Sequence, residues 1–204
     1  MSHERRTERR VLSVICFVLL LAALAYGFVL PFCWGNDPAG TYGTLSLLCE
    51  NHIPWFWLWT LLTGLGLSLN LEYLFRKYGY AGKLPRLAAA IGLVCMLLTA
   101  ATLNHSIADW NPKRVLHWIG AIGFAAGFAA AFILFFILNV RANKHFWFFI
   151  ALLGSTAAGV LVQLLTVGRN GYMEIVPVAL MELTLLALNF VLKAPTGAPD
   201  PAVC

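Results

Sequence analysis

The chain has 204 residues, of which 60% are apolar and only 11% are charged, and its mean hydropathy is +0.79. About a quarter of the residues in a soluble domain are charged, so the composition excludes an ordinary soluble protein. It also excludes a disordered chain, which would be rich in charge, and five cysteines are too few for a disulfide scaffold. The class that remains is a polytopic membrane protein.

Six stretches of the chain are long enough to cross a bilayer as helices, which takes about 20 apolar residues each. They are residues 11–30, 53–75, 87–104, 115–139, 146–168 and 171–192. The first stretch follows a basic segment but ends at Pro31-Phe32-Cys33-Trp34, without a small-residue cleavage site, which favours a retained helix over a signal peptide. We therefore predict a single all-α integral membrane domain over residues 1–193, an antiparallel six-transmembrane-helix bundle, followed by a disordered tail at 194–204.

The basic residues predict the orientation of the bundle, because positive charge marks the cytoplasmic side. With six spans, the termini and the second and fourth loops share one side, which carries most of the Lys and Arg. The other side holds only Lys113, Arg114 and Arg169. Both termini are thus expected in the cytoplasm, and the expected location is a bacterial plasma membrane. The net charge of +5 then indicates contact with anionic lipid headgroups and not with nucleic acid.

The first outer loop, residues 31–52, contains Cys33 and Cys49. Both would lie outside the cell, where oxidation is feasible, so the sequence permits a Cys33–Cys49 disulfide. Two free thiols are the alternative.

Small residues predict where helices pack closely, since leucine gains little from leaving lipid. The stretch 115–139 is rich in Gly and Ala, with Phe124, Phe128 and Phe132 along another face. The stretch 146–168 repeats the pattern around Gly154 and Gly159. We predict that these two helices form the centre of the bundle, with the Phe ridge in packing or lipid contact.

Ionisable residues inside the apolar stretches are candidate functional residues, because polar groups are costly in hydrocarbon. Glu182 is expected near the middle of the bilayer. The other candidates for a shared pocket gather toward the outer face: His52, His105, Asp109, His117 and Glu174. Helix-to-helix hydrogen bonding is the alternative role for Glu182, and either hydrogen bonding or interfacial solvation is the alternative for His105 and His117.

These residues also bear on cofactors. A metal site takes three or four His, Asp or Glu ligands, which the outer group could supply, but the spacings H-x-x-x-H and H-E-x-x-H do not occur. Haem would need two facing axial histidines, for which the chain offers no clear pair. We therefore predict no cofactor while leaving metal and haem open, and the sequence leaves open whether the protein is an enzyme.

Two segments resemble a known superfamily. They are LNHSIAD at residues 103–109, leading to HWIGAIGF at 117–124, and ALMEL at 179–183. Both resemble the six-helix superfamily of the damage-regulated autophagy modulators (DRAM) and the post-GPI-attachment lipid-remodelling proteins, and still more its bacterial relatives of unknown function. The resemblance covers the six-span layout. It implies lipid handling, with His117, Gly120, Ala121 and Glu182 as the family positions.

The leading functional hypothesis is a multi-pass membrane protein that binds or handles membrane lipid through a polar pocket in the outer leaflet. One alternative is an intramembrane lipid hydrolase that depends on a metal or on acid/base residues. A further alternative is a small proton-coupled transporter, acting as a homo-oligomer, with Glu182 as its proton site.

Overall fold

The computed structural model describes residues 3–35, 37–40, 44–103, 111–141 and 143–192. These residues form helices and no strands. The elements in chain order are α1 (His3–Val29), a 3₁₀ helix η1 (Leu30–Gly35), α2 (Leu45–Leu48), α3 (Ile53–Lys77), α4 (Leu84–Ala101), α5 (Pro112–Asn139), α6 (Phe146–Thr166), α7 (Tyr172–Leu186) and a π-helix η2 (Ala187–Val191).

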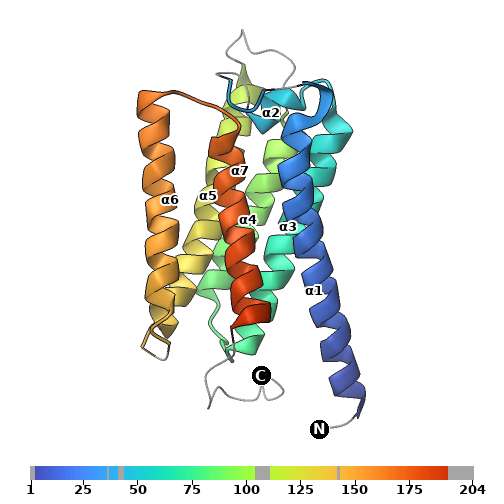
Figure 1. Cartoon of the computed structure of the whole chain (residues 1–204), viewed down its shortest axis with the longest axis vertical. Helices are drawn as coiled ribbons and strands as arrows, with labels where there is room; N and C mark the ends of the chain where they lie inside the picture. Colours follow the sequence, from blue (N-terminus) through green and yellow to red (C-terminus); the bar gives the residue numbers. More distant parts are fainter. Residues whose placement is uncertain (1–2, 36, 41–43, 104–110, 142, 193–204) are drawn as a thin grey trace.

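The long helices lie side by side in an antiparallel bundle (Figure 1). The short helix α2 lies across one end, which we call the α2 end. Helix α1 begins and η2 finishes at the opposite end, which we call the terminal end. This confirms the all-helical prediction.

Five segments of the described chain are long and apolar enough to cross a membrane: Arg10–Cys33, Leu84–Ala101, Pro112–Asn139, Phe146–Thr166 and Tyr172–Val191. The protein therefore has the helices of a multi-pass membrane protein. Helix α3 has 25 residues but is less apolar, because it carries polar side chains that include Thr60, Thr63 and Asn70. All three are buried within the bundle and so do not face lipid. The count of six spans stays a prediction.

The closest helix contact joins α4 and α5. A Cβ atom built on Gly127 would lie 2.6 Å from the backbone of Gly92, and one built on Gly120 would lie 2.6 Å from the Thr99 hydroxyl. Only glycine allows these backbones to approach so closely. The small residues of α5 do mark a tight interface, but the partner is α4.

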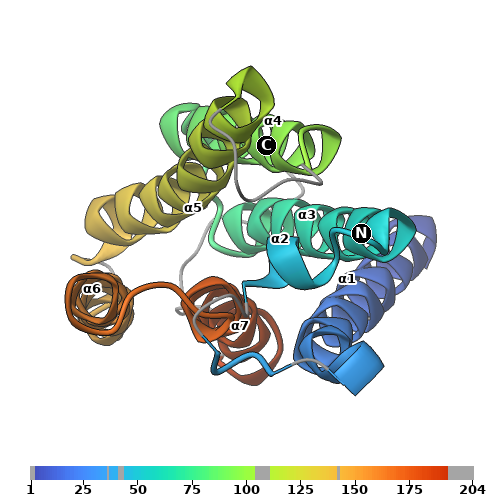
Figure 2. The same cartoon turned by 90° about the horizontal axis from the view of Figure 1, so that it is seen from above.

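The prediction that α5 and α6 form the centre of the bundle is wrong. Apart from the neighbouring backbone of α6 itself, no atom of the described residues lies within 4 Å of a Cβ added to Gly154 or Gly159. Figure 2 shows α6 at the edge of the bundle, close to one end of α5 and away from the other. The physical reason is that a small residue permits close packing but does not select the partner helix.

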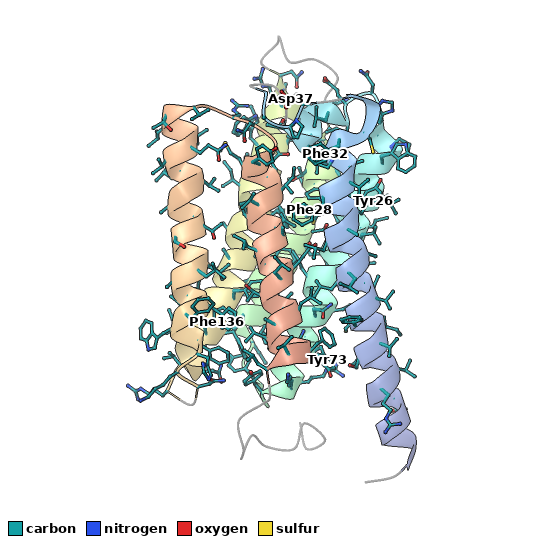
Figure 3. All side chains as sticks on the ribbon, in the orientation of Figure 1. Tyr26, Phe28, Phe32, Asp37, Tyr73 and Phe136 are labelled. Atoms are coloured by element: carbon teal, nitrogen blue, oxygen red, sulfur yellow. The ribbon has the colours of Figure 1, made fainter. Side chains whose placement is uncertain are left out.

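The Phe ridge of α5 is core and does not face lipid, since Phe124, Phe128 and Phe132 are all buried. At the terminal end, Phe135 and Phe136 pack on Phe146 of α6 with ring centroids 5.4 and 5.1 Å apart. Figure 3 shows Phe136 at this end. The ring cluster fastens α5 to α6 there, and the two helices diverge toward the α2 end.

A seam of polar contacts joins α3 to α1 and η2. The Asn70 amide donates to the carbonyls of Cys16 and Gly66, at 2.9 Å each, and the Asn189 amide donates to the Asn70 carbonyl at 2.9 Å. At the terminal end, Lys77 Nζ donates to the carbonyls of Leu188, Asn189 and Leu192. Lys77 thus supplies donors to carbonyls at the end of the last helix, which would otherwise lack them.

Candidate functional site

A cavity of about 470 Å³ lies among α3, α4, α5, α6 and α7. Ligand pockets typically measure about 300–1,000 Å³, so the space suits a small molecule or one part of a lipid. Its wall is apolar over most of its extent. Where α5 and α6 face the cavity, the wall includes a group of small residues: Ala121, Ala125, Ala126, Ala129, Gly154 and Ala157. Larger apolar side chains complete it, among them Ile133, Leu153 and Met181.

The small wall residues explain why the cavity exists. Helices α5 and α6 are held together at the terminal end by the ring cluster and separate toward the α2 end. Ala and Gly side chains on the facing surfaces are too short to fill the resulting wedge. The small faces that we expected to draw α5 and α6 together therefore leave space between them.

Polar groups line the cavity at the α2 end. Ser46 comes from α2, Thr99 from the last turn of α4, His117 from the second turn of α5 and Glu174 from the first turn of α7. The cavity is therefore amphipathic along its length, with an apolar body and a polar end.

His117 is oriented by a backbone contact. Its Nδ1 lies 2.9 Å from the Thr99 carbonyl oxygen, and the ring packs beside Phe56 with centroids 6.5 Å apart. Because a carbonyl only accepts hydrogen bonds, Nδ1 carries the hydrogen, and Nε2 is the acceptor of the neutral ring. His117 can thus receive a hydrogen bond from a ligand in the cavity.

Glu174 connects α7 to the segment before α3. Its carboxylate accepts hydrogen bonds from the backbone N–H of Ser46 at 3.3 Å and from the Ser46 hydroxyl at 3.5 Å, across 128 residues of sequence. Nearby, the Gly171 N–H donates to the Pro38 carbonyl at 2.9 Å. These contacts fix the first loop over the start of α7, and so hold the polar end of the cavity in place.

Glu182 does not line this cavity. It borders a separate space of about 10 Å³, with Gly27 and Phe28 of α1 on the far side. Figure 3 shows Phe28 between α1 and α7. Trp59 and Val178 border both spaces and separate them.

The Glu182 side chain is 2% exposed, and its Oε1 has no hydrogen-bond partner among the described residues. The Thr63 side chain lies beside the carboxyl. The structure therefore places His117 and Glu174 in the lining of one cavity, and separates Glu182 from that cavity by Trp59 and Val178.

The other predicted site residues lie apart from the cavity or outside the described chain. His52 is the N-cap residue of α3 and does not line the cavity, whereas His105 and Asp109 fall outside the described residues. Within the described segments, no three His, Cys, Asp or Glu side chains form a group that could hold a metal ion.

Cys33 and Cys49 are free thiols in the described structure, and the disulfide stays a prediction. Cys49 is fully buried, and this burial, with the nearby charges of Glu174 and Cys33, raises the pKa of its thiol to about 12. The thiolate is the reactive form, so Cys49 is held as an unreactive thiol.

Ser46, Ala125 and Ala129 are site residues that sequence reasoning missed, whereas the resemblance did name Ala121. Ala121, Ala125 and Ala129 recur every fourth residue, which places them on one face of a helix. The sequence shows this spacing of alanines, but we interpreted it as a prediction of close helix packing and not of a cavity. Ser46 carries no sequence signal, because its contact with Glu174 is made only by the fold.

Comparison of the chain with protein families, with curated proteins and with solved structures finds no significant match.

Proposed function

We propose that this multi-pass membrane protein binds a membrane lipid in the cavity among α5, α6 and α7. The observation that supports the proposal is the amphipathic cavity, with an apolar wall and a polar end formed by Ser46, His117 and Glu174. A lipid has the same division, since its acyl chains are apolar and its ester linkages and headgroup are polar. The chain would lie along the Ala and Gly wall, and a polar linkage would meet His117 Nε2.

The gap between α5 and α6 would provide a lateral entrance for the lipid. Ile122, Ala125, Gly154 and Ala157 line the cavity and are also exposed at the surface of the bundle. In a bilayer this surface faces lipid tails, so a chain would enter sideways between α5 and α6 without crossing water.

We further propose that α3 also crosses the membrane, in addition to the five apolar segments, which makes six spans. The α2 end would then lie at the outer face of a bacterial plasma membrane. The concentration of basic residues at the terminal end supports this orientation. We also propose that the protein is related to the DRAM and lipid-remodelling superfamily. A lipid-binding cavity is compatible with the lipid handling that this resemblance implies.

Native mass spectrometry of protein released from mild detergent tests lipid binding. The wild-type protein is expected to carry a discrete lipid. Ala157→Phe would fill the cavity and abolish retention, whereas Ala158→Phe, on the neighbouring exposed residue outside the cavity lining, would preserve it. Equal retention by both variants would contradict the proposed site.

A second candidate function is hydrolysis of the bound lipid. It is favoured by one observation, which is that a hydroxyl, an imidazole and a carboxylate line the same end of the cavity, from Ser46, His117 and Glu174. Release of fatty acid from a retained lipid, lost in both Ser46→Ala and His117→Gln, would support it. If the wild-type protein retains lipid but forms no product, hydrolysis is contradicted and only the binding proposal stands.

A further inference from the structure

Three basic residues gather beside the polar end of the cavity. Lys113 and Arg114 lie in the first turn of α5, and Arg169 lies in the connection between α6 and α7. Arg114 precedes His117 by three residues, which places it one helical turn above the cavity residue on the same face. These are the same three residues that the charge pattern assigns to the outer side of the membrane.

Arg169 bridges two helices at this rim. Its guanidinium lies over the Trp118 ring of α5, 3.8 Å from the centroid, so this side chain joins the α6–α7 connection to α5. Stacking on an aromatic ring holds the planar group in one orientation and leaves its N–H edges available to an acceptor.

Arg169 has two charged neighbours. The Arg114 charge acts on Arg169 as a like charge, and among the described residues the opposing charge comes from Glu174. The Glu174 carboxylate is already hydrogen-bonded to Ser46. The exposed Arg169 guanidinium can therefore receive a further anion at the rim.

We propose that the bound lipid is a phospholipid, whose phosphate lies against Arg169 while an acyl chain occupies the cavity. The inference rests on the proposed lipid-binding function and names the class of lipid. Guanidinium groups bind phosphate oxygens through paired, charge-assisted hydrogen bonds, which neutral diacylglycerol cannot offer. The phosphate would lie at the end of α5, at the level where Trp118 marks the membrane interface.

The test compares two lipids with identical chains, phosphatidylglycerol and diacylglycerol, added to delipidated full-length protein and counted by native mass spectrometry. Wild type is expected to retain the phospholipid about tenfold or more in preference to diacylglycerol. Arg169→Gln would lose that preference and Arg169→Lys would lose part of it. Arg141→Gln, which removes an exposed cation at the terminal end, would behave as wild type.

The outcomes separate the two proposals. Equal retention of both lipids by wild type, or an unchanged preference in Arg169→Gln, would overturn the phosphate site and leave lipid binding intact. If wild type retains neither lipid, both proposals fail. Glycerol phosphate, which has the anion without chains, should not displace the phospholipid; full displacement would show a site for soluble phosphate and overturn the inference.

Discussion

Glu182 is a buried carboxyl with an oxygen that lacks a hydrogen-bond partner among the described residues. A buried group left in this state costs about 1–3 kcal/mol. We expect Glu182→Leu to raise the free energy of unfolding by about that amount, measured as a higher thermal midpoint in detergent, whereas Glu182→Gln keeps a buried polar group and gains little. Loss of stability in Glu182→Leu would show instead that the carboxyl bonds the helices together, as in the alternative interpretation of this residue.

The two loop cysteines differ in environment. Cys49 is fully buried and burial raises its pKa to about 12, while Cys33 is partly exposed. A cysteine becomes thiolate only as the pH approaches its pKa. Because the pKa of Cys49 lies well above the range from about pH 7 to about pH 9, Cys49 should remain a thiol throughout this range. Iodoacetamide should therefore modify Cys33 and spare Cys49 until the protein is denatured, as peptide mass spectrometry would show. If neither residue reacts after denaturation without a reductant, the two are joined in a disulfide.

At the scale of the helices, the α4–α5 contact leaves no room for a side chain at Gly127. Alanine is favoured over glycine in a helix interior by about 1 kcal/mol, so Gly159→Ala, in open space on α6, should be neutral or stabilising. Gly127→Ala places a Cβ 2.6 Å from Gly92 and forces the two helices apart, which should cost about 1–3 kcal/mol or more. The thermal midpoint should fall in Gly127→Ala and stay the same or rise in Gly159→Ala; equal shifts would mean that α4 and α5 are not in close contact.

The apolar runs of the sequence predicted the long helices well. The expected spans 53–75 and 115–139 correspond to α3 (Ile53–Lys77) and α5 (Pro112–Asn139), because bilayer thickness fixes the length of an apolar helix. The pairing of helices could not be predicted. Gly127 needs a small partner, but only the fold shows that this partner is Gly92 and not Gly154.

The candidate site was predictable only in part. The cost of polar groups in hydrocarbon picked out His117 and Glu174, and both line the cavity. The same rule grouped Glu182 with them, although Glu182 faces α1 and is separated from the cavity by Trp59 and Val178. A sequence does not show which face of α7 meets which neighbour. The cavity itself arises from side chains too small to fill the space between diverging helices, and a missing side chain leaves no pattern of its own.

At the scale of the whole molecule, the number of spans decides which side of the membrane each loop occupies. If α3 crosses, Ala39, before α2, and Lys83, at the start of α4, lie on opposite sides; if it does not, they share one side. Both residues are exposed, so a cysteine at either is open to reagent. With the native cysteines replaced, a membrane-impermeant maleimide should label Ala39→Cys in intact cells and Lys83→Cys only after permeabilisation. Arg141→Cys, in the α5–α6 connection at the terminal end, is the matched control and should behave as Lys83→Cys.

Labelling of Ala39→Cys and Lys83→Cys from the same side would contradict six spans. Labelling of all three with sides exchanged would keep six spans, invert the orientation, and place the polar end of the cavity in the cytoplasmic leaflet.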